Sequence, residues 1–209
     1  MRSHSIFSRF LLALIIFSIL SVPLPIASGS YAGDKPLNTI SHDEIRGSVF
    51  FSLGDSEYSG GIKHNETYTV NFDVSVLRAK EVKLARLYVY WVWSKKENVG
   101  VYDYFSGVNV YDCNLNMAKT NLDSYSVTVE NVDANGSTFC VQGIGLLVIY
   151  ECHDHDPDCS YIEYWINEGC DMIYAEYGIT PEMATSKIYF DGEINVKNVR
   201  KAHLITVAP

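Results

Sequence analysis

One short segment gathers side chains that could hold a metal ion. Between Cys152 and Cys159 the chain reads His-Asp-His-Asp-Pro-Asp, so two sulfurs, two imidazoles and three carboxylates lie within eight residues. Zinc prefers sulfur and imidazole ligands, whereas calcium prefers carboxylates. The segment lacks both the Cys-x-x-Cys spacing of zinc modules and the glycine of a calcium-binding loop. If the chain is exported, we expect a disulfide between Cys152 and Cys159 that closes a solvated acidic loop without a metal site. Weak metal binding and a dedicated metal site that uses His153 and His155 are the alternatives.

Three acidic residues near aromatic residues could act on a sugar. Glu163, Glu168 and Asp171 lie close in sequence to Tyr164 and Trp165. Paired carboxylates hydrolyse glycosidic bonds, and aromatic rings stack on sugar faces. In a strand, however, successive side chains point to opposite faces, which would divide the two aromatic residues between core and surface. The pattern favours a structural role over a hydrolase, and we predict no catalytic residue and no cofactor.

Two sequence patterns indicate glycan attachment. Asn65-Glu-Thr67 and Asn135-Gly-Ser137 match the acceptor pattern for N-glycosylation, and both fall in expected turns. We predict Asn65 and Asn135 as acceptors in a host that has this machinery. The glycines at 143 and 145 lack the third glycine of a dinucleotide-binding loop and are followed by an apolar strand, so they indicate close strand packing or a bulge.

The N-terminus reads as an export signal. Arg2 and Arg9 are followed by a mainly apolar run over residues 10–20 and by small residues over 27–32. This order is typical of a cleaved secretory signal, whereas a membrane-spanning helix needs about 20 apolar residues. We predict a signal peptide over residues 1–32 and an extracellular or cell-surface location. An uncleaved N-terminal membrane anchor is the alternative.

Export determines how the other cysteines are interpreted. Outside the cell thiols tend to form disulfides, and Cys113 could join Cys140, leaving Cys170 as the odd thiol. Five reduced cysteines in a weakly oxidising exterior remain the alternative.

Charge and aromatic content narrow the class of protein. Removal of the signal would leave 14 basic against 25 acidic residues, a net charge of -11. Such a charge argues against nucleic acid or an anionic membrane surface as partner. Fifteen tyrosines and three tryptophans favour strands.

Hydrophobic periodicity predicts an all-β fold. Residues 67–76 alternate strictly between apolar and polar, as in a half-buried strand, whereas 84–93 is apolar on both faces and should be a central strand. In that central strand we expect Trp91 and Trp93 on one face and Tyr90 and Val92 on the other. The remaining strands are expected at 107–111, 125–129, 139–150, 161–166, 187–191, 193–199 and 202–207.

One helix is expected, close to the C-terminus. Thr180 is a typical N-cap residue and Pro181 suits the first helical position, so a short helix is predicted over 180–186. Together the segments predict an antiparallel, jelly-roll-like β-sandwich that forms a single domain over residues 37–209.

Three motifs in order carry a resemblance to a known family. They are Ala85-Arg-Leu-Tyr-Val-Tyr-Trp91, Gly143-Ile-Gly-Leu-Leu-Val-Ile-Tyr-Glu151 and Tyr164-Trp-Ile-Asn-Glu-Gly-Cys-Asp171, followed by Thr180-Pro-Glu. Over residues 41–209 the chain resembles an uncharacterised domain-of-unknown-function family of secreted surface proteins from methanogenic archaea. The resemblance implies a surface β-sandwich with no established catalytic residue. Family members continue beyond the strand-like 203–207, so the resemblance also implies a C-terminally shortened member.

These observations lead to two main functional hypotheses. The first is an exported structural or interaction module of the cell envelope, without catalytic activity, whose partners are other envelope proteins or surface polysaccharide. The second is a carbohydrate-binding module whose stacking platform comes from Trp91, Trp93, Tyr164 or Trp165. A secreted hydrolase that uses the acidic residues near 163–171 ranks third.

Overall fold

A computed structural model describes most of the chain after the predicted signal. The described residues are 35–96, 102–113, 115, 123–133, 137–152, 159–170 and 180–207, with the side chains of 35, 93–96 and 102–106 left out. The predicted signal peptide, Asn135, the interior of the 152–159 loop and Asp171 therefore lie outside the described residues. All described residues belong to one unit, residues 32–209.

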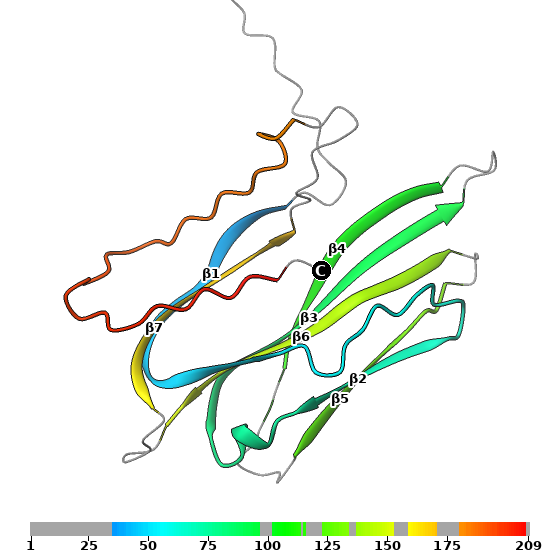
Figure 1. Ribbon diagram of the computed structural model, residues 1–209. Helices are drawn as coiled ribbons and strands as arrows, with labels where there is room; N and C mark the ends of the chain where they lie inside the picture. Colours follow the sequence, from blue (N-terminus) through cyan, green and yellow to red (C-terminus); the bar gives the residue numbers. More distant parts are fainter. Residues whose placement is uncertain are drawn as a thin grey trace, which may run out of the picture. The chain divides into compact units, whose positions relative to one another are not determined.

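The fold is an antiparallel, sandwich-like arrangement of two sheets, as the periodicity predicts (Figure 1). The larger sheet has five strands in the order β4-β3-β6-β1-β7, and the smaller sheet pairs β2 with β5. The strands described are β1 (Lys35–Ser52), β2 (Thr67–Asp73), β3 (Glu81–Lys96), β4 (Tyr102–Asp112), β5 (Ser124–Glu130), β6 (Thr138–Glu151) and β7 (Ser160–Cys170).

The long strand β1 was not predicted, although it joins two parts of the larger sheet. Residues 35–47 of β1 pair with β7, and residues 47–52 pair with β6. Register shifts between Lys35 and Asn38 and between Thr39 and Ser41 interrupt the pairing with β7. These irregularities break the period-two alternation by which a strand is recognised in sequence.

Strand β2 confirms the alternation but ends earlier than predicted. Val70 and Phe72 are fully buried, as expected for the inward face. Strand β2 stops at Asp73, whose carboxylate accepts the backbone N–H of Ser75 at 3.0 Å and leads into a short 3-10 helix, Ser75–Leu77. This turn leaves Val76 53% exposed and buries Leu77 completely, so the prediction that 67–76 is one strand was wrong at its end.

Apolar residues pack on both faces of the larger sheet. The main core lies between the two sheets and contains Ile62, Val70, Phe72, Val74, Leu77, Ala85, Leu87, Val89, Val141, Ile144, Leu146, Val148 and Tyr150. A second core is formed by Ile45, Ile149 and Ile166, which all belong to strands of the larger sheet. Because β6 contributes to both cores, it is buried along most of its length, which explains its continuous apolar run.

Strand β3 was predicted to be central and is an interior strand, paired with β4 on one side and β6 on the other, although β6 is the middle strand of the sheet. Tyr88 stacks with Tyr90 on one side of β3, with ring centroids 6.3 Å apart. Trp91 belongs to the other side, where it stacks with Phe139. The predicted opposition of Tyr90 and Trp91 is therefore confirmed, while the side chain of Trp93 lies outside the described residues.

The C-terminal segment differs from its prediction. Thr180 does cap a turn, because its Oγ1 accepts the N–H of Met183 at 3.4 Å and its carbonyl accepts the N–H of Ala184 at 3.0 Å. The turn covers only residues 181–184, so the predicted helix over 180–186 is absent. A single turn makes too few hydrogen bonds to offset the cost of helix nucleation.

The three strands predicted near the C-terminus are likewise absent. The segments 187–191, 193–199 and 202–207 have no strand partner among the described residues. Their apolar side chains remain largely exposed, including Tyr189 at 73% and Leu204 at 73%. The alternating pattern is real, but strand formation also requires a neighbouring backbone edge.

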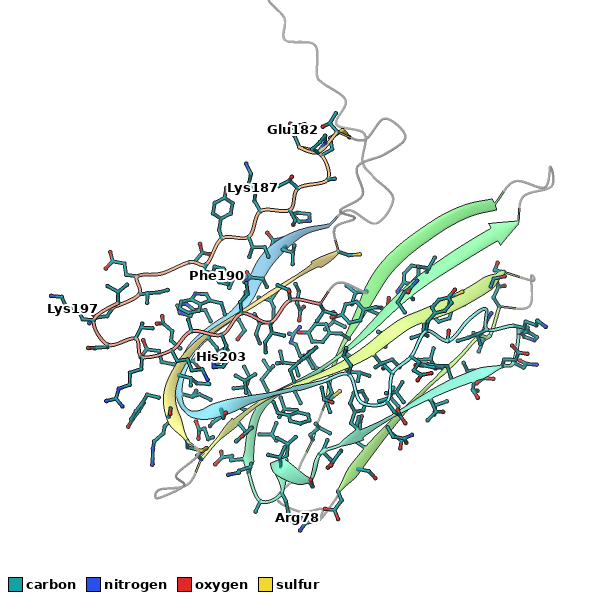
Figure 2. The ribbon with its side chains drawn as sticks, viewed as in Figure 1. Arg78, Glu182, Lys187, Phe190, Lys197 and His203 are labelled. Carbon is teal, nitrogen blue, oxygen red and sulfur yellow. A yellow bond between two sulfur atoms is a disulfide. The ribbon has the colours of Figure 1, made fainter. Side chains whose placement is uncertain are left out.

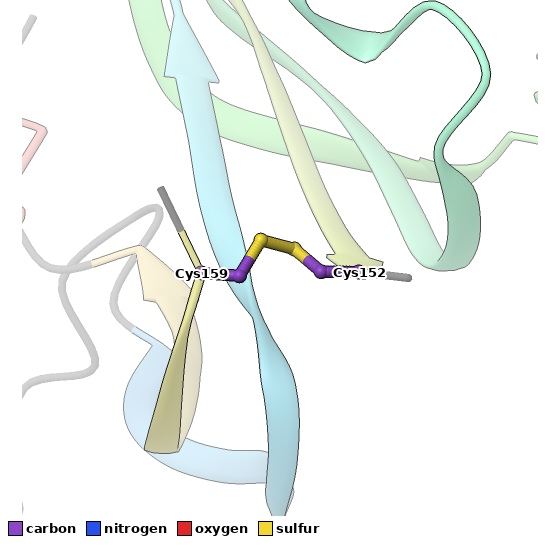
Figure 3. The surroundings of a disulfide bond; sticks show 2 residues. All are labelled: Cys152 and Cys159. Carbon is purple, nitrogen blue, oxygen red and sulfur yellow. A yellow bond between two sulfur atoms is a disulfide. The ribbon is translucent and has the colours of Figure 1, made fainter. Parts of the chain in front are cut away.

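The predicted disulfide between Cys152 and Cys159 is present, with a Cα–Cα separation of 6.1 Å. Figure 3 shows this bond passing across β1. The register places Gly47 of β1 between Glu151 and Ser160, the neighbours of the two cysteines. A side chain at Gly47 would collide with the carbonyl oxygen of Tyr150, so only glycine fits at this crossing.

The predicted pairing of Cys113 with Cys140 is wrong, and both thiols are free. The backbone N–H of Cys113 bonds the carbonyl of Ala85, whereas Cys140 pairs with Val92 on the other side of β3. Those two positions on β3 are separated by about 23 Å at roughly 3.3 Å per residue, and a disulfide needs Cα atoms within about 7 Å. The sequence did not reveal this separation because it depends on strand order.

Candidate functional site

The two sheets leave an open groove between β4 and β5. The groove encloses about 560 Å³, and its lining is mainly apolar. We call it the β4–β5 groove. It is lined by Leu87, Val89, Trp91, Asn109, Tyr111, Val127, Thr128, Val129 and Phe139. It exists because the smaller sheet has two strands and cannot cover the full width of the larger one.

A chain of polar contacts fixes the aromatic residues of the groove. The indole N–H of Trp91 donates to Oδ1 of Asn109 at 2.8 Å, and Nδ2 of Asn109 donates to the hydroxyl of Tyr111 at 3.3 Å. The Trp91 ring also lies close to Gly107, where an added Cβ would stand 2.7 Å from Cζ2 of the indole. Glycine in β4 therefore lets the indole lie flat against the strand.

Both long sides of the groove are strand edges. Among the described residues, β4 pairs only with β3, and β5 pairs only with β2. Each strand consequently presents a row of backbone N–H and C=O groups that no described strand takes up. Such an edge is a template for pairing with an added strand.

The acidic residue Glu168 is engaged inside the fold. Its carboxylate accepts two hydrogen bonds from Nη1 of Arg86, at 2.7 and 2.9 Å, and one from the hydroxyl of Tyr88 at 2.8 Å. Burial and the neighbouring Glu168 raise the pKa of Tyr88. Burial, followed by Glu168 and Cys170, raises the pKa of Tyr90 to about 12. The cluster holds β7 against β3 and leaves Glu168 little capacity to act on a ligand.

Glu163 occupies a different environment on the same strand. Its Oε1 lies 2.9 Å from Nε2 of His42, and the ring of His42 stacks on Trp165 at 4.5 Å. Glu163 and Glu168 are an odd number of positions apart in β7, so they point to opposite faces. The structure therefore does not bring these two carboxylates into a shared cleft, and Asp171 lies outside the described residues.

Tyr164 and Trp165, the other candidate sugar platform, are also divided. Tyr164 packs against the second core. Trp165 donates its indole N–H to the carbonyl of Asp191 at 2.6 Å and meets Phe190 edge to face. Trp165 is thus partly buried, with His42 stacked on its ring and the C-terminal segment beside it.

The predicted glycan acceptor Asn65 lies in an exposed turn before β2. Its backbone adopts a φ of 64°, a left-handed conformation that asparagine tolerates, and its N–H donates to the carbonyl of Asn131 at 2.7 Å. This backbone hydrogen bond does not involve the side-chain amide, and glycosylation at Asn65 stays a prediction.

Sequence reasoning identified only Trp91 among the groove residues. Asn109 and Tyr111 alternate with Gly107 along one side of β4, and this pattern could have indicated a polar and aromatic strand face. The participation of Val127 and Val129 could not be inferred, because it depends on how the two sheets pack.

Within the described residues no cluster of histidine, cysteine, aspartate and glutamate is placed to hold a metal. In this same part of the chain no helix is long and apolar enough to cross a membrane.

The fold and groove define a β-sandwich-like protein with an open side. Comparison with protein families finds a match to the model of the protein of unknown function DUF3344 over residues 30–100 and 94–209. The chain therefore belongs to the DUF3344 family. Comparisons with curated proteins and with solved structures give no match.

Proposed function

We propose that this chain is an exported module of the cell envelope that acts by binding other envelope components and not by catalysis. The observation that carries the proposal is the β4–β5 groove, a mainly apolar hollow between two strand edges. Partners that recognise such a surface supply an extended backbone and apolar side chains. Other envelope proteins meet this description.

Three features support export to a cell surface. The basic, apolar and small residues of 1–32 follow the order of a secretory signal. The disulfide between Cys152 and Cys159 suits an oxidising exterior. The sequence resemblance to secreted surface proteins of methanogenic archaea supports an archaeal envelope, with Asn65 and Asn135 as glycan acceptors.

The contacts of the acidic residues support a role without catalysis. Glu168 is held by Arg86 and Tyr88, and Glu163 by His42. Neither carboxylate reaches the β4–β5 groove, whose lining contains one amide, one phenol, one hydroxyl and one indole as its polar groups.

The test is retention of the protein in the envelope fraction of an exporting host. We expect the wild-type chain to sediment with envelope proteins and Tyr111→Asp, which places a charge in the groove, to be released several-fold more into the soluble fraction. Tyr161→Asp is the matched control, because Tyr161 is 85% exposed on β7 and does not line the groove. Equal release of wild type and Tyr111→Asp would contradict the proposal.

A specific observation keeps carbohydrate binding as a second candidate. Trp91 and Tyr111 line the groove beside the amide of Asn109, and aromatic rings with a nearby amide are suited to sugars. Surface polysaccharide should then quench tryptophan fluorescence in wild type and not in Trp91→Phe. A quench of equal size in both proteins would argue against sugar in this groove.

A further inference from the structure

A ten-residue stretch near the C-terminus has the pattern of a strand but no strand partner. Residues 187–196, here called the donor segment, read Lys-Ile-Tyr-Phe-Asp-Gly-Glu-Ile-Asn-Val. In a fully extended strand Ile188, Phe190, Ile194 and Val196 would share one side, and their exposed fractions are 36, 47, 47 and 77%. In the free molecule Gly192, with a φ of 109°, interrupts the extended backbone between the two pairs. Such a side is normally buried against a sheet.

The backbone of the donor segment is also largely unused. Among the described residues, its backbone-to-backbone hydrogen bonds are limited to that from the N–H of Asn198 to the carbonyl of Asn195, at 2.9 Å. Two side chains reach its carbonyls, Trp165 to Asp191 at 2.6 Å and Thr39 to Tyr189 at 3.4 Å. Figure 2 shows Phe190 of this segment beside β1 and β7. A few side-chain contacts therefore hold it there.

No described strand pairs with the free edge of β5 beside the groove, and the donor segment could supply one. A strand added to the free edge of β5 would extend the smaller sheet and cover the apolar lining formed by Leu87, Val89 and Val127. The donor segment spans about 33 Å when extended, at roughly 3.3 Å per residue, which is longer than the seven residues of β5. The groove lining contains no charged residue, so Lys187, Asp191 and Glu193 of the donor segment would meet no like charge there.

We propose that the donor segment of one copy inserts into the β4–β5 groove of a second copy as an added strand beside β5. The donor segment is held by Thr39 of β1 and Trp165 of β7, and neither residue lines the groove, so each molecule keeps its donor outside its own groove. Because donor and groove are different surfaces, the contact is head-to-tail and leads to open chains or closed rings of molecules. This inference rests on the proposed interaction function and names its partner.

Two variants that each lose one surface test the inference. The donor variant carries Ile188→Asp and Ile194→Asp, and the acceptor variant carries Tyr111→Asp. Wild type should form oligomers whose mass rises with concentration, and each variant alone should remain monomeric in light scattering. An equal mixture should restore a species of twice the monomer mass, because one intact donor can still enter one intact groove.

The controls distinguish this contact from misfolding and from nonspecific association. Both variants should keep the circular dichroism of wild type, and Leu204→Asp, an exposed position outside the donor segment, should still oligomerise. Trp165→Phe, which loses the hydrogen bond to Asp191, should raise the oligomeric fraction.

A wild type that is monomeric at all concentrations, or a mixture that stays monomeric, would overturn the inference. Envelope retention that persists in such a case would leave the proposed function standing, so the two failures can be told apart.

Discussion

The carboxylate of Glu168 lies 2.7 Å from Nη1 of Arg86, although the two residues are 82 positions apart and their strands are not neighbours. Strands β6 and β1 lie between β3 and β7 in the sheet order. The contact therefore requires the larger sheet to curl, which brings its edge strand β7 back over β3. Tyr88 completes the contact by donating its hydroxyl to the same carboxylate.

Loss of the Glu168 charge should weaken the contact between β7 and β3 and lower the stability of the fold. Glu168→Gln keeps the shape but leaves Arg86 with a weakened partner while its side chain is only 20% exposed. We expect the free energy of unfolding to fall by about 2 to 3 kcal/mol, as for hydrogen bonds to charged groups. Urea unfolding followed by fluorescence measures this change.

An exposed ion pair provides the control for Glu168. Arg78 pairs with Asp123 at the surface, with side chains 52 and 64% exposed. Asp123→Asn should cost less than about 1 kcal/mol. Equal effects at the two sites would show that Glu168 is not held inside the fold.

The raised pKa of Tyr90 predicts a loss of stability at alkaline pH. Below about pH 10 the hydroxyl is protonated in both folded and unfolded chains. Between about pH 10 and the folded pKa of about 12, only the unfolded chain ionises, so the free energy of unfolding falls with rising pH by about 1.4 kcal/mol per unit. Tyr90→Phe should make this slope shallower. Parallel stability curves for the two proteins between pH 10 and 12 would contradict the prediction.

The disulfide should stabilise the chain without a metal. For a loop as short as 152–159 the chain-entropy model gives about 2.5 kcal/mol, so Cys152→Ser with Cys159→Ser should lower stability by that order. Chelators should leave the melting temperature unchanged, because stability linked to a metal falls when the metal is withdrawn. Under non-reducing conditions, alkylation after unfolding should modify Cys113 and Cys140 but not the disulfide pair. A large effect of chelator, with all thiols reactive, would point to His153 and His155 as ligands.

Two glycines give a matched test of the groove wall. An alanine Cβ at Gly107 would stand 2.7 Å from the indole of Trp91, whereas a Cβ at Gly143 has no atom within 4 Å. Gly107→Ala should therefore cost about 1 to 3 kcal/mol through overpacking. Gly143→Ala should be close to neutral or slightly stabilising. Thermal unfolding distinguishes these outcomes, and a neutral Gly107→Ala would mean that the indole moves freely.

Export predicts a specific mature N-terminus. Sequencing the protein from an exporting host should find a start between Ser28 and Lys35, because the small residues before it suit signal cleavage. If Met1 were found intact, the protein would be membrane-anchored and not secreted.

Local pattern was enough to predict most of the strands and one disulfide. Alternation in 67–73 and the continuous apolar run in 139–150 depend on which faces are buried, and that information is carried by the residues themselves. Cys152 and Cys159 are close in sequence, so their pairing needs little knowledge of the fold.

Only the tertiary structure decided which segments meet. The order β4-β3-β6-β1-β7 separates Cys113 from Cys140 and joins Arg86 to Glu168, and neither follows from local pattern. The same holds for residues 187–196, whose alternation predicts a strand that has no partner among the described residues. A strand is completed by the backbone edge beside it, and the position of that edge is a property of the whole fold.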